Sequence, residues 1–143
     1  MNVFCPYSRS LEANPQCLDP SRLGNQVYRE AKTLLNGGWP HHPAARMWRG
    51  HEGALCMYAL AGLRELSGRG RDYPHHVEWF KARLRACSLR QCEIPRWWGD
   101  ERVHKSHRAV LLAKNFEWYG RFGWTEAPAV QDEKGRWPYF WPV

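Results

Sequence analysis

The stretch of the chain with the greatest chemical potential is RVHKSHRAVLLAKNFEWYG, residues 102–120. Its first half gathers imidazole and cationic side chains, namely His104, Lys105, His107 and Arg108. Residues three and four positions apart share one face of a helix, so the two imidazoles and the guanidinium would lie together. Such a face could bind phosphate, and histidine, which titrates near neutral pH, could act there as a general acid or base. The alternative is a pair of half-buried, hydrogen-bonded histidines that only support the fold.

A second set of chemical groups lies on a helix predicted over residues 20–35. Its polar stripe has one carboxylate among cations, namely Arg22, Gln26, Arg29 and Glu30, with Lys32 nearby. A lone carboxylate beside arginines is expected to stay ionised, because nearby positive charge favours the anion. We therefore interpret Glu30 as a group that stabilises positive charge developing on a sugar ring. The alternative is a solvated helix face with pairs of opposite charge.

The segment GGWPHHPAARMWRGHE, residues 37–52, adds basic and aromatic groups around a predicted helix start. Those that could contact DNA are His42, Arg46, Trp48 and Arg49. The free backbone N–H groups of a helix N-terminus bind phosphate, and guanidinium groups bind it bidentately. Trp48 either stacks on a base or belongs to the core.

The composition favours a nucleic-acid partner. The 143 residues carry a formal net charge of +7 and nine tryptophans, and sixteen of the 21 basic residues are arginine. Arginine forks match phosphate geometry, and basic charge mixed with aromatics is typical of proteins that bind nucleic acids. We expect a nucleic acid as the partner, and the resemblance described below implies double-stranded DNA. The alternative is the arginine-rich composition of a protein from a GC-rich genome.

The cysteines and the apolar runs exclude other classes. The five cysteines form no C-x-x-C pair, so we expect free thiols, no metal site and no cofactor. The N-terminus lacks the pattern of a signal peptide. The apolar run at residues 54–63 is about ten residues long, too short to span a bilayer. We expect a cytoplasmic monomer without membrane contact.

The pattern of caps and apolar residues predicts one all-α domain over residues 1–143. Asp19 followed by Pro20 is a helix start, and Gly37 and Gly38 end that helix. Further helices are expected over residues 43–67, 74–87 and 100–115. Glycines at 50, 53 and 62 either permit close packing of the second helix or mark a break in it. The expected architecture is a compact bundle of about four helices with an aromatic-rich C-terminal coil.

Three motifs together resemble the pyrimidine-dimer DNA glycosylase family. They are LDPSRLGNQVYREAKTLL at 18–35, HHPAARMW at 41–48, and HKSHR at 104–108 before WYGRFG at 118–123. The chain is most similar to a compact bacterial and phage branch of that family. The likeness to this branch covers most of the chain, including the aromatic PYFWP ending.

The resemblance implies a function and a mechanism. Members of the family excise damaged pyrimidines: the chain's own α-amino group attacks sugar C1′ and expels the base. The Schiff base formed then allows β-elimination, which is an AP-lyase activity. A glutamate that supports both steps matches Glu30, and the flanking cations match Arg29 and Lys32. Recognition of the substrate by the aromatic tail would fall on Trp118 and Tyr119, which would fill or pack beside the space of a flipped nucleotide. The setting implied is a bacterial or phage-infected cell.

The sequence departs from the family pattern at its start. The chain begins Met1-Asn2, so the amine would belong to Met1, and Asn2 stands where the family has an arginine. Lys105 is a second candidate amine, and His104 with His107 could supply acid and base to a glycosylase that needs no amine. Two alternatives remain open. One is a metal-dependent nuclease that uses His42 with His104 and His107, and the other is a catalytically silent DNA-binding module.

Overall fold

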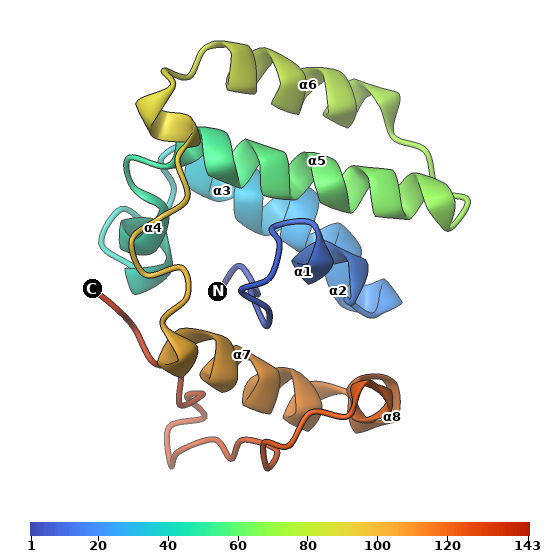
Figure 1. Ribbon diagram of the computed structural model, residues 1–143, viewed down its shortest axis with the longest axis vertical. Helices are drawn as coiled ribbons and strands as arrows, with labels where there is room; N and C mark the ends of the chain where they lie inside the picture. The colour runs from blue at the N-terminus through green and yellow to red at the C-terminus, as the bar shows by residue number, and fades with distance from the viewer.

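The computed structural model describes all residues from Met1 to Val143 and consists of helices and connecting segments without strands (Figure 1). The α-helices are α1 (Ala13–Gln16), α2 (Pro20–Gly24), α3 (Lys32–Leu35), α4 (Pro43–Trp48), α5 (Glu52–Gly68), α6 (Pro74–Arg85), α7 (Glu101–Lys114) and α8 (Phe116–Tyr119). A π-helical stretch, η1 (Asn25–Ala31), joins α2 to α3, and short 3₁₀ turns lie at η2 (Arg90–Cys92) and η3 (Gly120–Phe122). The all-α prediction is confirmed. No helix is long and apolar enough to cross a membrane.

The helix predicted over residues 20–35 is present, but seven of its residues, 25–31, have π geometry. It begins where the sequence indicates: the Asp19 side chain accepts a hydrogen bond from the Arg22 N–H at 3.0 Å, and Pro20 takes the first position. The wider π turns of η1 carry Gln26, Arg29 and Glu30. Such π segments occur frequently at functional sites.

The single helix predicted over residues 43–67 is two helices, α4 and α5. Gly50, with φ +84°, lies in the left-handed region that favours glycine, and it turns the chain between them. Gly62 has a different reason to be small. A Cβ on it would lie 2.5 Å from Cγ2 of Val27, so its absence lets α5 lie directly against η1.

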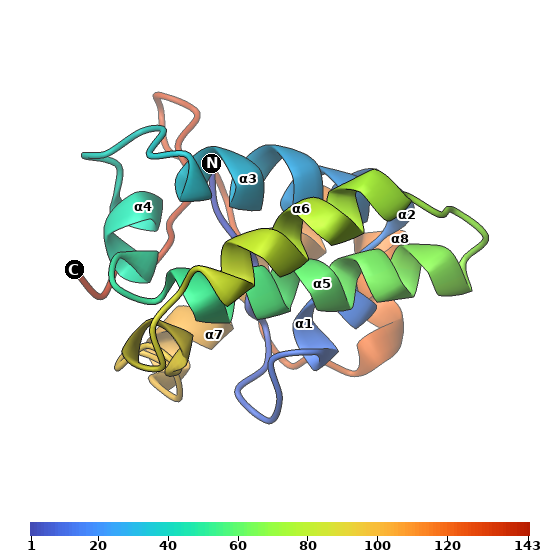
Figure 2. The same cartoon turned by 90° about the horizontal axis from the view of Figure 1, so that it is seen from above.

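Helix α5 is the centre of the fold. It is buried on nearly all sides and contacts α1, α2, η1 and α6. Helices α5 and α6 run side by side in both views, while α7 crosses on the opposite side of the molecule (Figures 1 and 2). One hydrophobic cluster joins these elements, so the core is continuous across the chain.

The C-terminal part packs back on the helices. Residues 124–143 contain no helix, and their aromatic side chains lie against the core. The Trp124 ring stacks on Tyr119 at 5.6 Å between centroids, with 12° between planes. Tyr139 lies against Phe4 and His107, which brings the end of the chain to its beginning.

Candidate active site

The N-terminal segment, residues 2–6, runs as an extended chain through the interior and is buried throughout. An extended buried chain needs partners for its backbone polar groups, and no strand lies beside it. Gln26 of η1 supplies two of them. Its Oε1 accepts from the Phe4 N–H at 2.7 Å, and its Nε2 donates to the Asn2 carbonyl at 3.1 Å. The Tyr58 hydroxyl donates to the Phe4 carbonyl at 2.7 Å.

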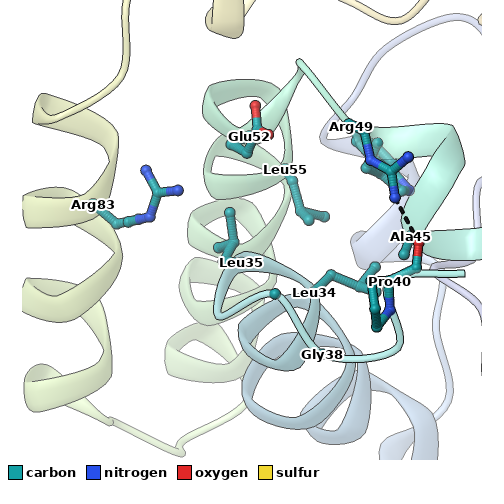
Figure 3. A pocket seen from close by; sticks show the side chains of 11 residues that line it. Leu34, Leu35, Gly38, Pro40, Ala45, Arg49, Glu52, Leu55 and Arg83 are labelled. Atoms are coloured by element: carbon teal, nitrogen blue, oxygen red, sulfur yellow. Dashed lines mark hydrogen bonds between the residues drawn. The ribbon is translucent and has the colours of Figure 1, made fainter.

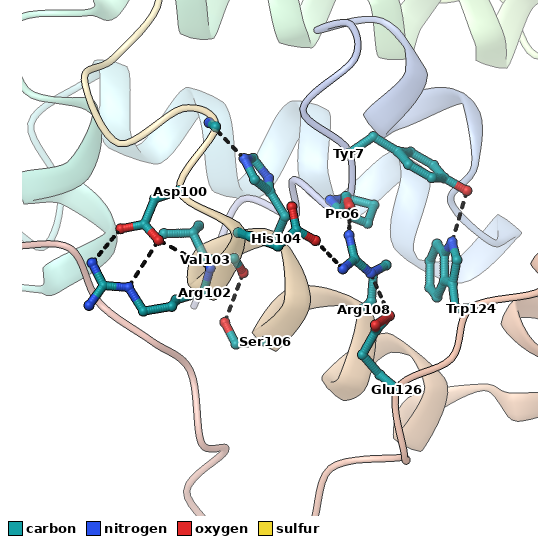
Figure 4. A network of polar contacts seen from close by, with 12 residues as sticks. Pro6, Tyr7, Asp100, Arg102, Val103, His104, Ser106, Arg108, Trp124 and Glu126 are labelled. Atoms are coloured by element: carbon teal, nitrogen blue, oxygen red, sulfur yellow. Dashed lines mark hydrogen bonds and ion pairs between the residues drawn. The ribbon is translucent and has the colours of Figure 1, made fainter.

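His104 and His107 hold the same segment from the side of α7. His107 Nδ1 accepts from the Cys5 N–H at 2.8 Å, and His104 Nδ1 donates to the Cys5 carbonyl at 2.7 Å. His104 Nε2 accepts from the Gly99 N–H at 3.0 Å (Figure 4). The H-x-x-H spacing thus places two imidazoles on either side of one residue, where they replace a neighbouring strand.

The surroundings of the two histidines do not fit the direct acid–base role that the sequence suggested. Both rings are fully buried and neither lines a cavity with Met1 or Glu30. Burial lowers the pKa of His107 from 6.5 to about 3, and the electrostatic interaction with neighbouring His104 lowers it further. His107 is therefore neutral, and its Nε2 lies 3.0 Å from Nδ2 of the Asn2 carboxamide. The two histidines instead hold the N-terminal segment in place at Cys5, and with Gln26 on the other side they are called the clamp below.

Asn2 occupies an enclosed position beside the clamp. The Asn2 side chain is 4% exposed and lies between His107 and Tyr139, whose hydroxyl it also contacts. A short carboxamide fits this enclosed position, whereas an arginine would require a buried counter-charge. Asn2 therefore anchors the segment and leaves Met1 as its first residue outside the core.

Met1 lies in an open cavity of about 490 Å³. The cavity is lined by Met1, Asn25, Arg29, Glu30, Thr33, Trp39 and His42. Groups predicted from three separate parts of the sequence thus meet here: Met1, then Glu30 with Arg29, and His42, which caps the start of α4. The structure brings them together through η1, the N-terminal segment and the loop at residues 36–42.

Glu30 is held in a partly dehydrated position. Desolvation raises the pKa of the Glu30 carboxyl above its ordinary value, and the positive charges of the N-terminal amine and Arg29 only partly oppose this. The sequence-based expectation was the reverse balance, in which nearby cations dominate. The Glu30 Oε2 atom is buried and has no hydrogen-bond partner, which is rare for a polar atom inside a protein.

His42 is the histidine that shares the cavity. Its Nδ1 accepts from the Ala44 N–H at 3.0 Å and caps α4. Desolvation lowers the pKa of His42, and the nearby N-terminal charge lowers it further. Neutral His42 therefore carries its proton on Nε2, away from the cap. The ring also meets Trp141 edge-on at 5.6 Å, so the end of the chain supports it.

Several predicted DNA contacts are engaged within the protein instead. Trp48 is buried between Tyr58 and Trp97, so it is a core residue. The Arg108 side chain is 14% exposed, pairs with Glu126 at 2.5 Å and with Glu101, and donates to the Pro6 carbonyl at 2.8 Å (Figure 4). Its position makes it another holder of the N-terminal segment.

Trp118 and Tyr119 hold the start of α2. Trp118 Nε1 donates to the Cys17 carbonyl at 2.8 Å, and the buried Tyr119 hydroxyl accepts from the Asp19 N–H at 3.0 Å. Neither lines the cavity with Met1. Their geometry does not support contact with a flipped nucleotide in that cavity.

Two of the remaining predicted cations contact other side chains of the protein, and four are exposed to solvent. Arg22 forms an ion pair with Asp19 at 2.6 Å, and the Lys32 ammonium lies 4.6 Å from the centre of the Trp79 ring. The exposed ones are Arg29, Arg46, Arg49 and Lys105. No three His, Cys, Asp or Glu side chains are placed to hold a metal ion, so His42 does not join His104 and His107 in the cluster that a metal-dependent nuclease would need.

Trp39 lines the cavity and is 62% exposed, and it was not predicted from the sequence. The signal was present in GGWPHH, where a large aromatic residue stands between a helix stop and a proline.

On the other side of the same loop lies a smaller cavity of about 230 Å³, lined among others by Arg49, Glu52 and Arg83 (Figure 3).

Comparison with known proteins identifies a family for the chain. The family model for pyrimidine dimer DNA glycosylase matches residues 1–81, which include every residue that lines the Met1 cavity. No curated protein matches the chain, and no solved structure does. The match covers more than half of the chain, and the chain belongs to the pyrimidine dimer DNA glycosylase family.

Proposed function

We propose that this protein is a DNA glycosylase and AP lyase that excises a damaged or modified pyrimidine, with the α-amine of Met1 as nucleophile and Glu30 as its partner. The observation that carries the proposal is the cavity shared by Met1, Glu30 and Arg29. An amine and a carboxyl that stand together in an open, cationic cavity are the parts that Schiff-base chemistry on a sugar requires.

The chemistry proceeds in two stages. The neutral amine attacks sugar C1′, and the bond from C1′ to the base breaks with its electron pair, which leaves on the base together with a proton. The sugar ring then opens, and the C1′–nitrogen bond becomes an imine. Removal of a C2′ proton breaks the C3′–oxygen bond, and that electron pair leaves on the phosphate. Glu30 stabilises the positive charge of the first stage and is placed to accept the C2′ proton of the second.

The clamp supports this role by fixing the amine. Gln26, His104 and His107 hold Asn2 through Cys5, so Met1 is presented at a defined place beside Glu30. Asn2 is buried, so an amine on Asn2 would lie inside the core and away from the cavity. The proposal therefore requires that Met1 remains on the protein. In this scheme His104 and His107 position the nucleophile and do not transfer protons.

Arginine side chains support duplex DNA as the partner. Arg29 lines the cavity, and Arg46 and Arg49 are exposed on helix α4 and at its end. Guanidinium groups bind phosphate well, so Arg29 is suited to a phosphate beside an extruded nucleotide. A monomer suffices, because one chain supplies all these groups.

Borohydride trapping on a duplex with one abasic site tests the proposal. Borohydride reduces an imine between protein and DNA to a stable amine, so a covalent adduct reports the intermediate directly. We expect an adduct that peptide mass spectrometry maps to Met1, and the same measurement shows whether Met1 is retained. Acetylation of the α-amine should abolish the adduct while the side-chain amine of Lys105 is left free.

Other outcomes have definite meanings. An adduct that maps to Lys105 would keep the reaction class but move the nucleophile out of the cavity. Salt-sensitive binding with no adduct would refute the amine mechanism. If base release then still occurred, the protein would be a monofunctional glycosylase; if no product formed with any substrate, it would be a DNA-binding module.

A further inference from the structure

Only two apolar side chains line the Met1 cavity, Met1 and Trp39, and of these only Trp39 is aromatic. Most of its lining is polar or charged, as in Asn25, Arg29, Glu30 and Thr33. These groups suit a sugar and its phosphates but offer no flat face to a base. The indole of Trp39 does, and with 62% of its surface exposed it is free to receive one.

Trp39 also has an unusual backbone. Its φ of +54° is in the left-handed region, and it is the one residue other than glycine in this protein with a positive φ. A bulky residue is rare there, and such conformations persist where the surroundings impose them, often at functional sites. Glycine or asparagine would adopt this conformation with less strain, so local folding does not account for tryptophan.

The loop that carries Trp39 is held at both ends. Before it, the Gly37 and Gly38 N–H groups donate to the Leu34 and Thr33 carbonyls and close α3. After it, the His42 N–H donates to the Trp39 carbonyl at 3.0 Å, and Arg49 Nη2 donates to the Pro40 carbonyl at 2.5 Å (Figure 3). The exposed indole is therefore mounted on a fixed turn.

We propose that Trp39 stacks on the nucleobase that the site draws out of the duplex and so determines recognition of base-containing substrates. This inference rests on the proposed function of the same cavity. A base that leaves the helix loses its stacking neighbours, and an aromatic side chain replaces part of that interaction with little dependence on base identity. Arg29 would hold the adjoining phosphate while the ring receives the base.

The kinetic test compares Trp39→Ala with Phe116→Ala on two duplexes. Phe116 is a matched control, since it is 63% exposed but lies on α8 and does not line the cavity. On a duplex with a pyrimidine dimer, Trp39→Ala should lower kcat/KM for base release about 5- to 150-fold, the loss of one base–aromatic stack. On a duplex with an abasic site, which has no base to stack, strand cleavage should change by less than about threefold.

Two further results decide the interpretation. Trp39→Phe should restore most of the activity on the dimer, because a phenyl ring still stacks. Equal losses on both duplexes, or no loss on either, would overturn the role of Trp39 and leave the proposed function standing.

Photo-crosslinking keeps the test independent of catalysis. A duplex with one 5-iododeoxyuridine mispaired with guanine offers a pyrimidine that is easily extruded. Irradiation of the complex should give a crosslink that maps to Trp39, persists in Phe116→Ala and disappears in Trp39→Ala. A crosslink that maps elsewhere refutes the inference, even if the wild-type protein releases no base and the proposed function has failed.

Discussion

Acidification should weaken this protein through one buried histidine. His107 has a pKa of about 3 in the folded chain because burial disfavours its charged form, against 6.5 for the free side chain. The unfolded chain therefore binds a proton in a range where the folded chain does not. Stability is complete above pH 6.5 and is lost as the pH falls from there towards about 3.

The size of the effect follows from the two pKa values. Each unit of difference corresponds to about 1.4 kcal/mol, so His107 alone removes about 5 kcal/mol of unfolding free energy by the end of that range. Between about pH 7.5 and pH 5 the loss is about 2 kcal/mol. Domains of this kind have about 5–15 kcal/mol in total, so the loss is measurable by urea unfolding.

The comparison that isolates the residue is His107→Asn. The asparagine oxygen takes the place of Nδ1 and can still accept from the Cys5 N–H, but it does not titrate. The variant should be less stable at neutral pH, since it loses ring contacts with Phe4 and Tyr139, yet its unfolding free energy should fall about 2 kcal/mol less on acidification to about pH 5. Parallel pH profiles for the two proteins would show that His107 is not buried and neutral, and the clamp would have to be abandoned.

Two further outcomes concern the cavity. Glu30→Gln should lower turnover in single-turnover cleavage about 100- to 10,000-fold, while DNA affinity measured by titration is kept. The control Glu78→Gln, on the exposed face of α6, should match the wild type. Retained turnover in Glu30→Gln would remove Glu30 from the mechanism. Arg29→Ala should weaken binding to all duplexes and reduce the slope of log affinity against log salt by about 0.9, as expected for one lost phosphate contact. The control Arg64→Ala, on the exposed side of α5, should leave that slope unchanged. An unchanged slope in Arg29→Ala would exclude a phosphate contact at Arg29.

Local sequence signals were sufficient for much of the fold. The helix starts at Asp19 and Asp100 were predictable because a cap is formed by residues within three positions of each other. The π geometry of η1 was not, because the residue types at 25–31 fit an ordinary α-helix equally well. The glycine pattern allowed either close packing of an unbroken helix or a break in it, and the structure has the break at Gly50.

The site was predictable in its residue types more than in their roles. Glu30 was singled out as the one carboxylate among the cations of its helix, Met1 came from the resemblance to the family, and the two line one cavity. His104 and His107 were assigned to chemistry because an H-x-x-H face serves equally well as a reactive pair or as a pair of hydrogen-bonding supports. Only burial separates these uses, and burial depends on the whole fold. Trp39 was missed because the adjacent glycines indicated nothing more than a helix end.

The clamp also sets an order of assembly. Cys5 is held by His104 and His107, 99 and 102 positions further along the chain, whereas Gln26 and Tyr58, which hold Asn2 and Phe4, are much nearer in sequence. Contacts over long sequence separations form late, after the loop between them has closed. The N-terminal segment is therefore expected to dock first on η1 and α5 and to reach its final place only when α7 packs over Cys5. Under the proposed mechanism, a chain truncated before α7 would carry the same amine without the full set of contacts that fixes it beside Glu30.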